Sequence, residues 1–115
     1  MRALLIDPEL KTVTSVDVKN HYKAFNDIIE AETGTVVQVN SKNDLWLDDD
    51  GLLNPTHFWH WKGSNQSFSG KGLLLGSTED GGNSSTRVSI KKATEQITWD
   101  APETKPMVIA FWGTE

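Results

Sequence analysis

The apolar residues of this chain fall into short runs, each closed by a turn signal, and this pattern limits the fold more than any other feature. Residues 2–6 form one run, and residues 12–18 form a second, β-branched run after a turn at residues 7–10, which begins with Asp7 and Pro8. Proline fixes its own φ and aspartate hydrogen-bonds nearby amides, so both residues favour turns. We therefore expect an N-terminal β-hairpin.

Four further segments read as strands, namely 35–39, 44–47, 57–61 and 72–76. The last of these encloses three leucines between glycines, which is typical of a buried strand. Three consecutive aspartates before Gly51 lack the alternate oxygen spacing of a calcium loop, whose twelfth position from Asp48 is Trp59 here. Asp-Gly between apolar strands instead predicts a hairpin turn.

One segment, about 20–33, has helical spacing, with apolar residues at 22, 25, 28 and 29. Asn20 is the expected cap and Gly34 the expected left-handed residue at its end. Its charges oppose the helix dipole, because lysines lie near the start and Glu30 and Glu32 near the end. They are either tolerated surface charges or an acidic spot for a basic partner.

The second half of the chain contains a second, short helix, about 89–96, which Ser89 caps. Residues 77–86 form a flexible loop rich in Ser, Gly and Asn, and 100–115 form a C-terminal extension with a strand at 107–112. Strands, one main helix and then more strands predict a single α+β domain over 1–115 with a largely antiparallel sheet.

Composition excludes several classes of protein. The chain of 115 residues has no cysteine, so disulfides and thiolate metal sites are absent and a reducing compartment fits. No apolar stretch is long enough for a secretory signal or a membrane span, and we expect a cytoplasmic protein without membrane contact. The net charge of −5 disfavours general nucleic-acid binding through a basic face.

The five tryptophans are unusual beside a single tyrosine, and two of them flank His60. Strand alternation places His57, Trp59 and Trp61 on one face and Phe58, His60 and Lys62 on the other, one face being core. The two histidines then point apart, and only His21, an Asp or a Glu could supply the third ligand that zinc needs, so we expect no metal site. The second face is a candidate surface for a ligand.

Residues 70–72, Gly-Lys-Gly, are the most suggestive short piece. Glycines let the backbone approach a ligand, Lys71 supplies a positive charge, and successive amides in such a bend can cradle an anion. The spacing is not that of a Walker loop. The alternative is a tight turn with a solvated lysine. With no GxSxG and no cysteine nucleophile, we expect no catalytic residues, no cofactor and no enzymatic activity.

Three stretches together resemble a small uncharacterised family that is carried by phages and their bacterial hosts and is known only as a domain of unknown function. They are residues 3–8 continuing to 12–16, residues 44–55, and Gln66 followed by residues 70–76. The likeness covers roughly residues 3–99, although Ser64–Ser67 replaces the family's usual Tyr-Pro-Gln-Pro. The resemblance implies a mobile-element setting and no transferable activity.

We therefore expect a phage or mobile-element accessory protein that binds a host or bacterial-defence protein stoichiometrically in the host cytoplasm. Alternatives are a sponge for a small anionic ligand such as a signalling nucleotide, a small metal-dependent hydrolase that uses His57 or His60, and a structural subunit of a homo-oligomer. The candidate ligand-binding residues are Phe58, Trp59, His60, Trp61, Lys62, Gln66, Gly70, Lys71 and Gly72.

Overall fold

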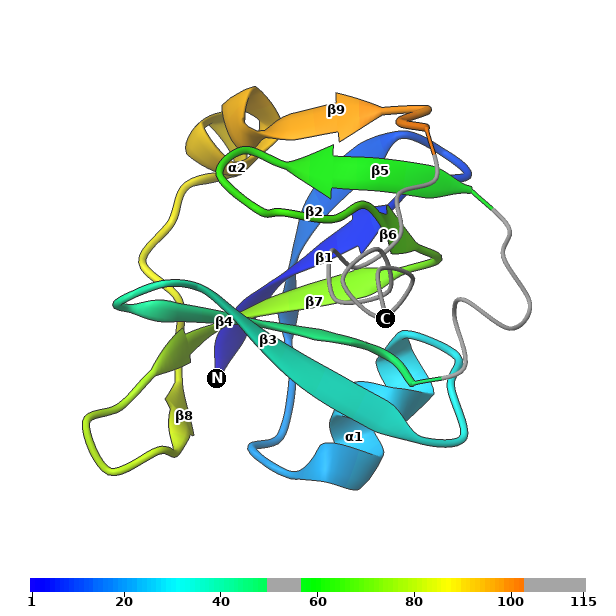
Figure 1. The fold of residues 1–115 in the computed structure, drawn as a ribbon. Coiled ribbons are helices and arrows are strands. Elements are labelled where there is room, and N and C mark those ends of the chain that lie inside the picture. Colours follow the sequence, from blue (N-terminus) through cyan, green and yellow to red (C-terminus); the bar gives the residue numbers. More distant parts are fainter. Residues whose placement is uncertain (50–56, 103–115) are drawn as a thin grey trace, which may run out of the picture.

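Two antiparallel sheets and two short helices build the fold in the computed structural model, which describes residues 1–49 and 57–102 (Figure 1). The larger sheet has the order β2-β1-β7-β4-β3, with β8 also pairing with β7, and the smaller sheet has the order β6-β5-β9. Every strand pairing is antiparallel. The α+β fold class with a mostly antiparallel sheet is confirmed.

The elements follow one another with short connections. The strands are β1 (Arg2–Asp7), β2 (Thr12–Asp17), β3 (Gly34–Asn40), β4 (Asn43–Asp48), β5 (Phe58–Trp61), β6 (Phe68–Ser69), β7 (Gly72–Ser77), β8 (Asn83–Ser84) and β9 (Ile97–Trp99). The helices are α1 (Tyr22–Ile28) and α2 (Ile90–Gln96).

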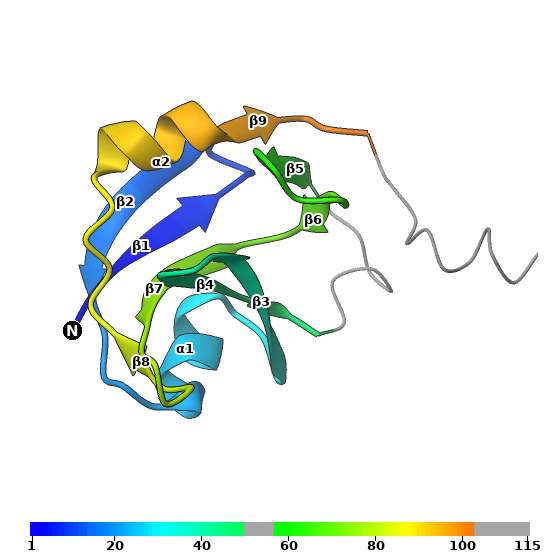
Figure 2. The same cartoon turned by 60° about the vertical axis from the view of Figure 1, so that its left-hand side comes forward.

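The larger sheet lies between two layers (Figure 2). On one face it packs against the smaller sheet and α2, around an inner core that includes Leu4, Leu45, Trp59 and Leu74. On the other face it packs against α1, around a helix-side core that includes Phe25 and Leu73. Because neighbouring strand residues point to opposite faces, the central strand β7 needs apolar residues on both sides. This explains its unbroken run of leucines.

The local sequence signals located most elements correctly. The N-terminal hairpin pairs Arg2 with Asp17 and Asp7 with Thr12, and Asp7 Oδ1 accepts hydrogen bonds from the N–H groups of Glu9 and Leu10 at 3.0 and 3.2 Å. The four predicted strands appear as β3, β4, β5 and β7. Ser89 caps α2, because its Oγ accepts a hydrogen bond from Lys92 N–H at 3.0 Å.

The main helix is shorter than the predicted segment 20–33 and is capped differently. His21, not Asn20, is the N-cap, and its Nδ1 accepts a hydrogen bond from Lys23 N–H at 3.2 Å. Asn20 instead donates to the carbonyl of Asn83. The prediction that Gly34 ends the helix is wrong, since Gly34 begins β3.

Packing explains the glycine at position 34. A Cβ there would lie 2.1 Å from Trp46 Nε1 and 2.6 Å from Asn26 Oδ1. These two atoms form a 2.8 Å hydrogen bond that ties β4 to α1. A side chain at position 34 would therefore break the contact between the helix and the sheet.

The predicted loop 77–86 contains a short strand, and two other predicted segments are not described by the structure. Residues 77–86 are not wholly loop, because Asn83 and Ser84 form β8 and pair with Ser77 and Gly76. Asp50 and Gly51 of the predicted turn, and the predicted strand 107–112 in the C-terminal extension, lie outside the described residues. Among the described residues, no helix is long and apolar enough to cross a membrane.

The layered core predicts a large difference between two leucine-to-alanine substitutions. Leu74→Ala removes a side chain that is 0% exposed at the centre of β7 and should lower the free energy of unfolding by about 2–5 kcal/mol. Leu10→Ala is the matched control, because Leu10 is 70% exposed, and should change it by less than about 0.5 kcal/mol. Urea unfolding measures both, and equal effects would contradict this placement of β7.

Candidate functional site

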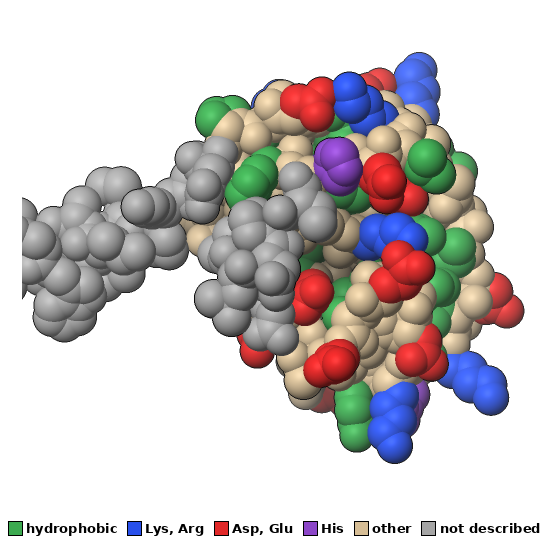
Figure 3. Space-filling model, turned by 90° about the vertical axis from the view of Figure 1, so that its right-hand side faces the viewer, with side chains coloured by type: hydrophobic (Ala, Val, Ile, Leu, Met, Phe, Trp, Pro, Cys, Tyr) green, Lys and Arg blue, Asp and Glu red, His purple; other side chains and the backbone are tan. Residues whose placement is uncertain are grey.

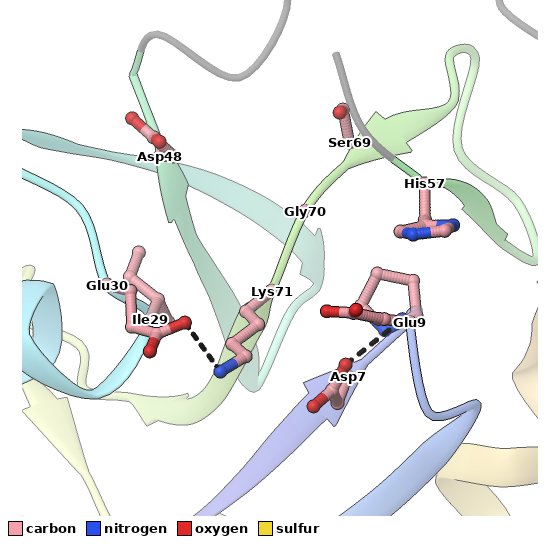
Figure 4. A pocket seen from close by; sticks show the side chains of 10 residues that line it. Asp7, Glu9, Ile29, Glu30, Asp48, His57, Ser69, Gly70 and Lys71 are labelled. Carbon is pink, nitrogen blue, oxygen red and sulfur yellow. Dashed lines mark hydrogen bonds and ion pairs between the residues drawn. The ribbon is translucent and has the colours of Figure 1, made fainter. Parts of the chain in front are cut away.

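A cleft of about 320 Å³ opens where the ends of several elements meet (Figure 4). It is bounded by the β1–β2 turn, the end of α1, the end of β4, the start of β5 and the link from β6 to β7. The residues that line it are Asp7, Pro8, Glu9, Ile29, Glu30, Asp48, His57, Ser69, Gly70 and Lys71.

Carboxylates dominate the cleft. Asp7, Glu9, Glu30 and Asp48 are acidic, and Lys71 is the one lysine or arginine among the described residues that line it. Figure 3 shows acidic side chains around a basic one on this face, with a histidine beside them. At neutral pH the ionised groups therefore give the cleft a negative balance that attracts cations.

Glu30 lies where the end of a helix usually has glycine. The N–H groups of Glu30 and Ala31 donate to the carbonyls of Asp27 and Asn26 at 3.2 and 2.9 Å, which is the Schellman arrangement. Glu30 is its left-handed residue, with φ of 59°. Left-handed backbone costs a residue with a Cβ roughly 1–2 kcal/mol, and a negative charge at a helix C-terminus opposes the dipole.

Lys71 is the partner of Glu30. Its Nζ lies 2.7 Å from Glu30 Oε2, and the side chains of Lys71 and Glu30 are 25% and 72% exposed. The hydrogen bond to Glu30 raises the pKa of Lys71 above its ordinary value of 10.5; partial burial opposes this shift, and the charges of Glu30, Asp7 and Glu9 add to it. Lys71 is therefore held as a cation inside a ring of carboxylates.

The predicted aromatic residues divide between core and surface as strand alternation requires. Trp59 and Trp61 are buried, at 0% and 4% exposure, and belong to the inner core. Trp59 packs on Phe68 and donates its Nε1–H to the carbonyl of Gly70 at 2.8 Å. Neither indole has a free face for a ligand, and Trp59 instead fixes the backbone at the edge of the cleft.

The same packing accounts for the other tryptophans that the structure describes. Trp46 packs against the helix-side core and Trp99 against the inner core. Gly72 lies in β7, and a Cβ there would come within 2.8 Å of Trp59 Cζ2. Gly72 is thus a packing residue, and the four tryptophans that the structure describes all lie in or pack against the two cores.

The outward face of β5 does not join the cleft. Phe58 and His60 are half-buried and Lys62 is exposed, and His60 Nε2 lies 2.9 Å from the carbonyl of Ser64. Gln66 lines a smaller hollow of about 100 Å³ next to Phe68, which adjoins the cleft at Asp48 and Ser69. Of the candidate residues, the structure brings Gly70 and Lys71 together in the cleft and leaves the remainder outside it.

Sequence reasoning missed most of the carboxylates that line the cleft. Asp7, Glu9 and Asp48 are predicted only as parts of turn signals. Glu30 carried a signal, since an acidic residue at the end of a helix contradicts the dipole rule. Within residues 1–49 and 57–102, no group of three histidine or carboxylate side chains is arranged to hold a metal ion.

Comparison with known proteins identifies a family without a known activity. The family model described as a domain of unknown function (DUF3846) matches residues 1–98. No curated protein and no solved structure matches the chain. The matched range includes every residue that lines the cleft.

The left-handed backbone of Glu30 predicts a stability order for two variants. Glu30→Gly and Glu30→Ala both remove the ion pair, but only glycine removes the backbone strain. The free energy of unfolding of the glycine variant should therefore exceed that of the alanine variant by about 1 kcal/mol. The same pair of substitutions at Glu32, which lies outside α1 and whose φ is not positive, is the control and should give the reverse order because glycine has more conformational entropy in the unfolded chain. Denaturant unfolding at pH 7 measures all four, and a Glu30→Gly variant less stable than Glu30→Ala would refute the strain.

The ion pair predicts a lower pKa for Lys71 in Glu30→Gln than in the wild type, because the main cause of the upward shift is removed. A raised lysine pKa adds stability that is complete below the ordinary value and is lost as the pH rises through the folded value. The stability advantage of the wild type over Glu30→Gln should therefore be constant from pH about 7 to 10 and shrink as the pH rises above the ordinary lysine pKa of 10.5. NMR titration of the Lys71 side chain gives the pKa, with Glu79→Gln as control; an unchanged pKa in Glu30→Gln would exclude the pair in solution.

Proposed function

We propose that this chain, which belongs to the DUF3846 family, acts by stoichiometric binding of a protein that presents a basic side chain to the acidic cleft. The proposal rests on the observation that four carboxylates and one lysine line a cleft of about 320 Å³. This volume lies at the lower end of ligand pockets and suits one side chain or a short segment. An arginine fits such a site because its planar guanidinium forms two parallel hydrogen bonds with a carboxylate.

The ion pair between Lys71 and Glu30 supports a site where one cation replaces another. Glu30 is largely exposed, so an incoming guanidinium can reach its carboxylate without moving the backbone. Exposed ion pairs contribute only about 0–1 kcal/mol, so separating this pair costs little. Lys71 therefore occupies the cleft until a partner arrives, and its charge lowers the affinity for weakly basic groups.

The position of Glu30 is a second support. Residues kept in strained backbone concentrate at functional sites, where an interaction outweighs the local cost. Glycine would suit the end of α1 better on both conformational and electrostatic grounds. A glutamate at this position destabilises the end of α1 but adds a carboxylate to the cleft, which is consistent with a role in binding.

The resemblance supports a host protein or a bacterial-defence protein as the partner. In this proposal the chain is a phage or mobile-element accessory protein that acts in the host cytoplasm, a setting that its lack of cysteine suits. It inhibits or redirects its target by occupying a basic surface, and no chemical step is needed.

Electrostatics favour a cationic over an anionic ligand at this cleft. A phosphate that reached Lys71 Nζ would displace Glu30 and approach the charges of Asp7 and Glu9, which already act on this lysine. Like charges that approach one another repel more strongly where water is partly excluded. The anion-binding role predicted for Lys71 would have to overcome this repulsion.

Substitution of the acidic residues should weaken binding of a basic probe. In a ¹⁵N NMR titration with an acetylated, amidated Gly-Arg-Gly peptide, we expect shifts centred on Gly70 and Ile29, and at least tenfold weaker binding by Glu9→Gln/Glu30→Gln. Loss of about 1.4 kcal/mol corresponds to this factor. Glu79→Gln/Glu95→Gln removes the same charge elsewhere and should bind nearly as the wild type does. Equal loss in both double variants would mean that net charge, not the cleft, attracts the peptide.

Lys71→Ala separates the cationic from the anionic ligand by the sign of its effect. Removal of the lysine leaves four carboxylates without their internal cation, so affinity for the Gly-Arg-Gly peptide should rise about threefold or more. An anion site at Lys71 would instead lose phosphate binding in this variant. Lys62→Ala is the matched control outside the cleft. A weaker peptide affinity for Lys71→Ala would overturn the proposed function.

A further inference from the structure

A second pocket, of about 470 Å³, lies at the opposite end of β7. Lys71 precedes the first residue of β7, whereas Gly76 and Ser77 at the end of the strand line this second pocket. A strand of six residues spans about 17 Å between its end residues, so the two sites are separate. Figure 1 shows the hairpin of β7 and β8 projecting on the side away from the start of β5.

The chemistry of this pocket is the reverse of that of the acidic cleft. Among the described residues, it is lined by two cations and no carboxylate. Three serines supply further hydroxyl groups, whereas the side chain of Asn43 is bonded to Thr86 and Asn40. The full lining is Lys42, Asn43, Gly76, Ser77, Ser84, Ser85, Arg87 and Val88.

Both cations are available to a ligand. Lys42 and Arg87 are exposed, and neither makes an ion pair among the residues that the structure describes. In a protein with a net charge of −5, two unneutralised cations at one pocket form a local reversal of the surface charge. Such a reversal draws anions from solution.

The walls of the pocket are held by hydrogen bonds that leave these cations unused. Thr86 Oγ1 donates to Asn43 Oδ1 at 2.8 Å in a buried contact, and Arg2 Nη1 donates to the carbonyls of Thr86 and Val88 at 2.9 and 2.8 Å. Arg2 N–H also donates to Ser85 Oγ at 2.9 Å. The segment 84–88 is thereby fixed against β1 and β4, so the pocket is formed before a ligand binds.

Gly76 brings Ser84 and Ser85 close to the strand. A Cβ at this position would lie 2.6 Å from Ser84 Oγ and 2.7 Å from the carbonyl of Ser85. Any larger residue would push the serines outward. Glycine therefore permits Ser84 and Ser85 to pack closely against β7 where they line the pocket.

The nearby acids have other partners. Asp44 Oδ2 accepts a hydrogen bond from Asn83 Nδ2 at 3.2 Å, and partial burial raises the pKa of Asp44, with the Asn83 bond opposing the shift. Asp80, in the β7–β8 turn, accepts hydrogen bonds from Thr78 Oγ1 and Gly82 N–H. Neither acid lines the pocket.

We propose that this pocket, which we call the serine pocket, binds a small phosphate monoester. The phosphoryl oxygens would accept hydrogen bonds from Lys42, Arg87 and the hydroxyls of Ser84 and Ser85. A fork-shaped guanidinium beside a lysine is a common pair for phosphate recognition. The volume exceeds what a phosphate alone needs, so part of the organic group is enclosed too.

The test is a ¹⁵N NMR titration of the whole chain with inorganic phosphate, glucose 6-phosphate and adenosine 5′-monophosphate. We expect shifts at Gly76, Ser77, Ser84 and Ser85, and binding at least tenfold weaker in Lys42→Gln/Arg87→Gln. Lys19→Gln/Lys62→Gln removes the same charge from exposed positions outside both pockets and should bind as the wild type does. Since all four side chains are exposed, every variant is expected to fold, and thermal unfolding checks this.

The three probes separate the sources of the phosphate group. Tighter binding of either monoester than of inorganic phosphate supports enclosure of an organic group and tells a sugar from a nucleotide. Equal binding of all three reduces the site to a phosphate site and overturns the monoester. No shift at the serine pocket, or equal weakening in both double variants, overturns the proposal altogether. None of these outcomes bears on the acidic cleft, whose probe is a cation.

Discussion

Burial of strand β7 on both faces is the constraint on which the rest of the structure depends. Leu74 joins the inner core, while Leu73 and Leu75 join the helix-side core. The strand pairs with β1 on one side and with β4 on the other, and its leucines pack against the layers on both faces of this sheet. Its two ends emerge from this fixed centre, and the acidic cleft and the serine pocket are built around them.

The two sites divide the charge of the molecule. The acidic cleft holds its lysine in an ion pair, whereas the cations of the serine pocket make no ion pair among the described residues. Trp59 connects core and cleft, because its indole is buried and its Nε1–H binds the carbonyl of Gly70, the residue before Lys71. Gly70 is left-handed, with φ of 79°, and it turns the chain from β6 into β7. Packing thus determines where Lys71 lies, and the surrounding carboxylates determine the charge of the groups that can approach it.

Local signals were enough to predict the parts of the fold that depend on neighbouring residues. The hairpin at Asp7, the strand of three leucines and the cap at Ser89 follow from turn, strand and capping preferences. The end of α1 did not follow, because Glu30 takes a conformation that favours glycine and its carboxylate pairs with a lysine 41 residues away. The preference for glycine at helix ends therefore predicted Gly34 as the end of the helix. The structure requires glycine at position 34 because a side chain there would clash with Trp46. Local rules could not predict the two sites either, because each site is formed by residues from several segments that are distant in the sequence.

The central claim, that the acidic cleft receives a basic side chain, is tested most directly by isotope-filtered NOEs between the labelled chain and the unlabelled Gly-Arg-Gly peptide. His57 lines the cleft and is exposed, so its ring protons report on a ligand that enters there. The account predicts NOEs from the arginine Hδ protons to the ring protons of His57. NOEs to the outward face of β5 or to β8 in place of these, from a bound peptide, would contradict it.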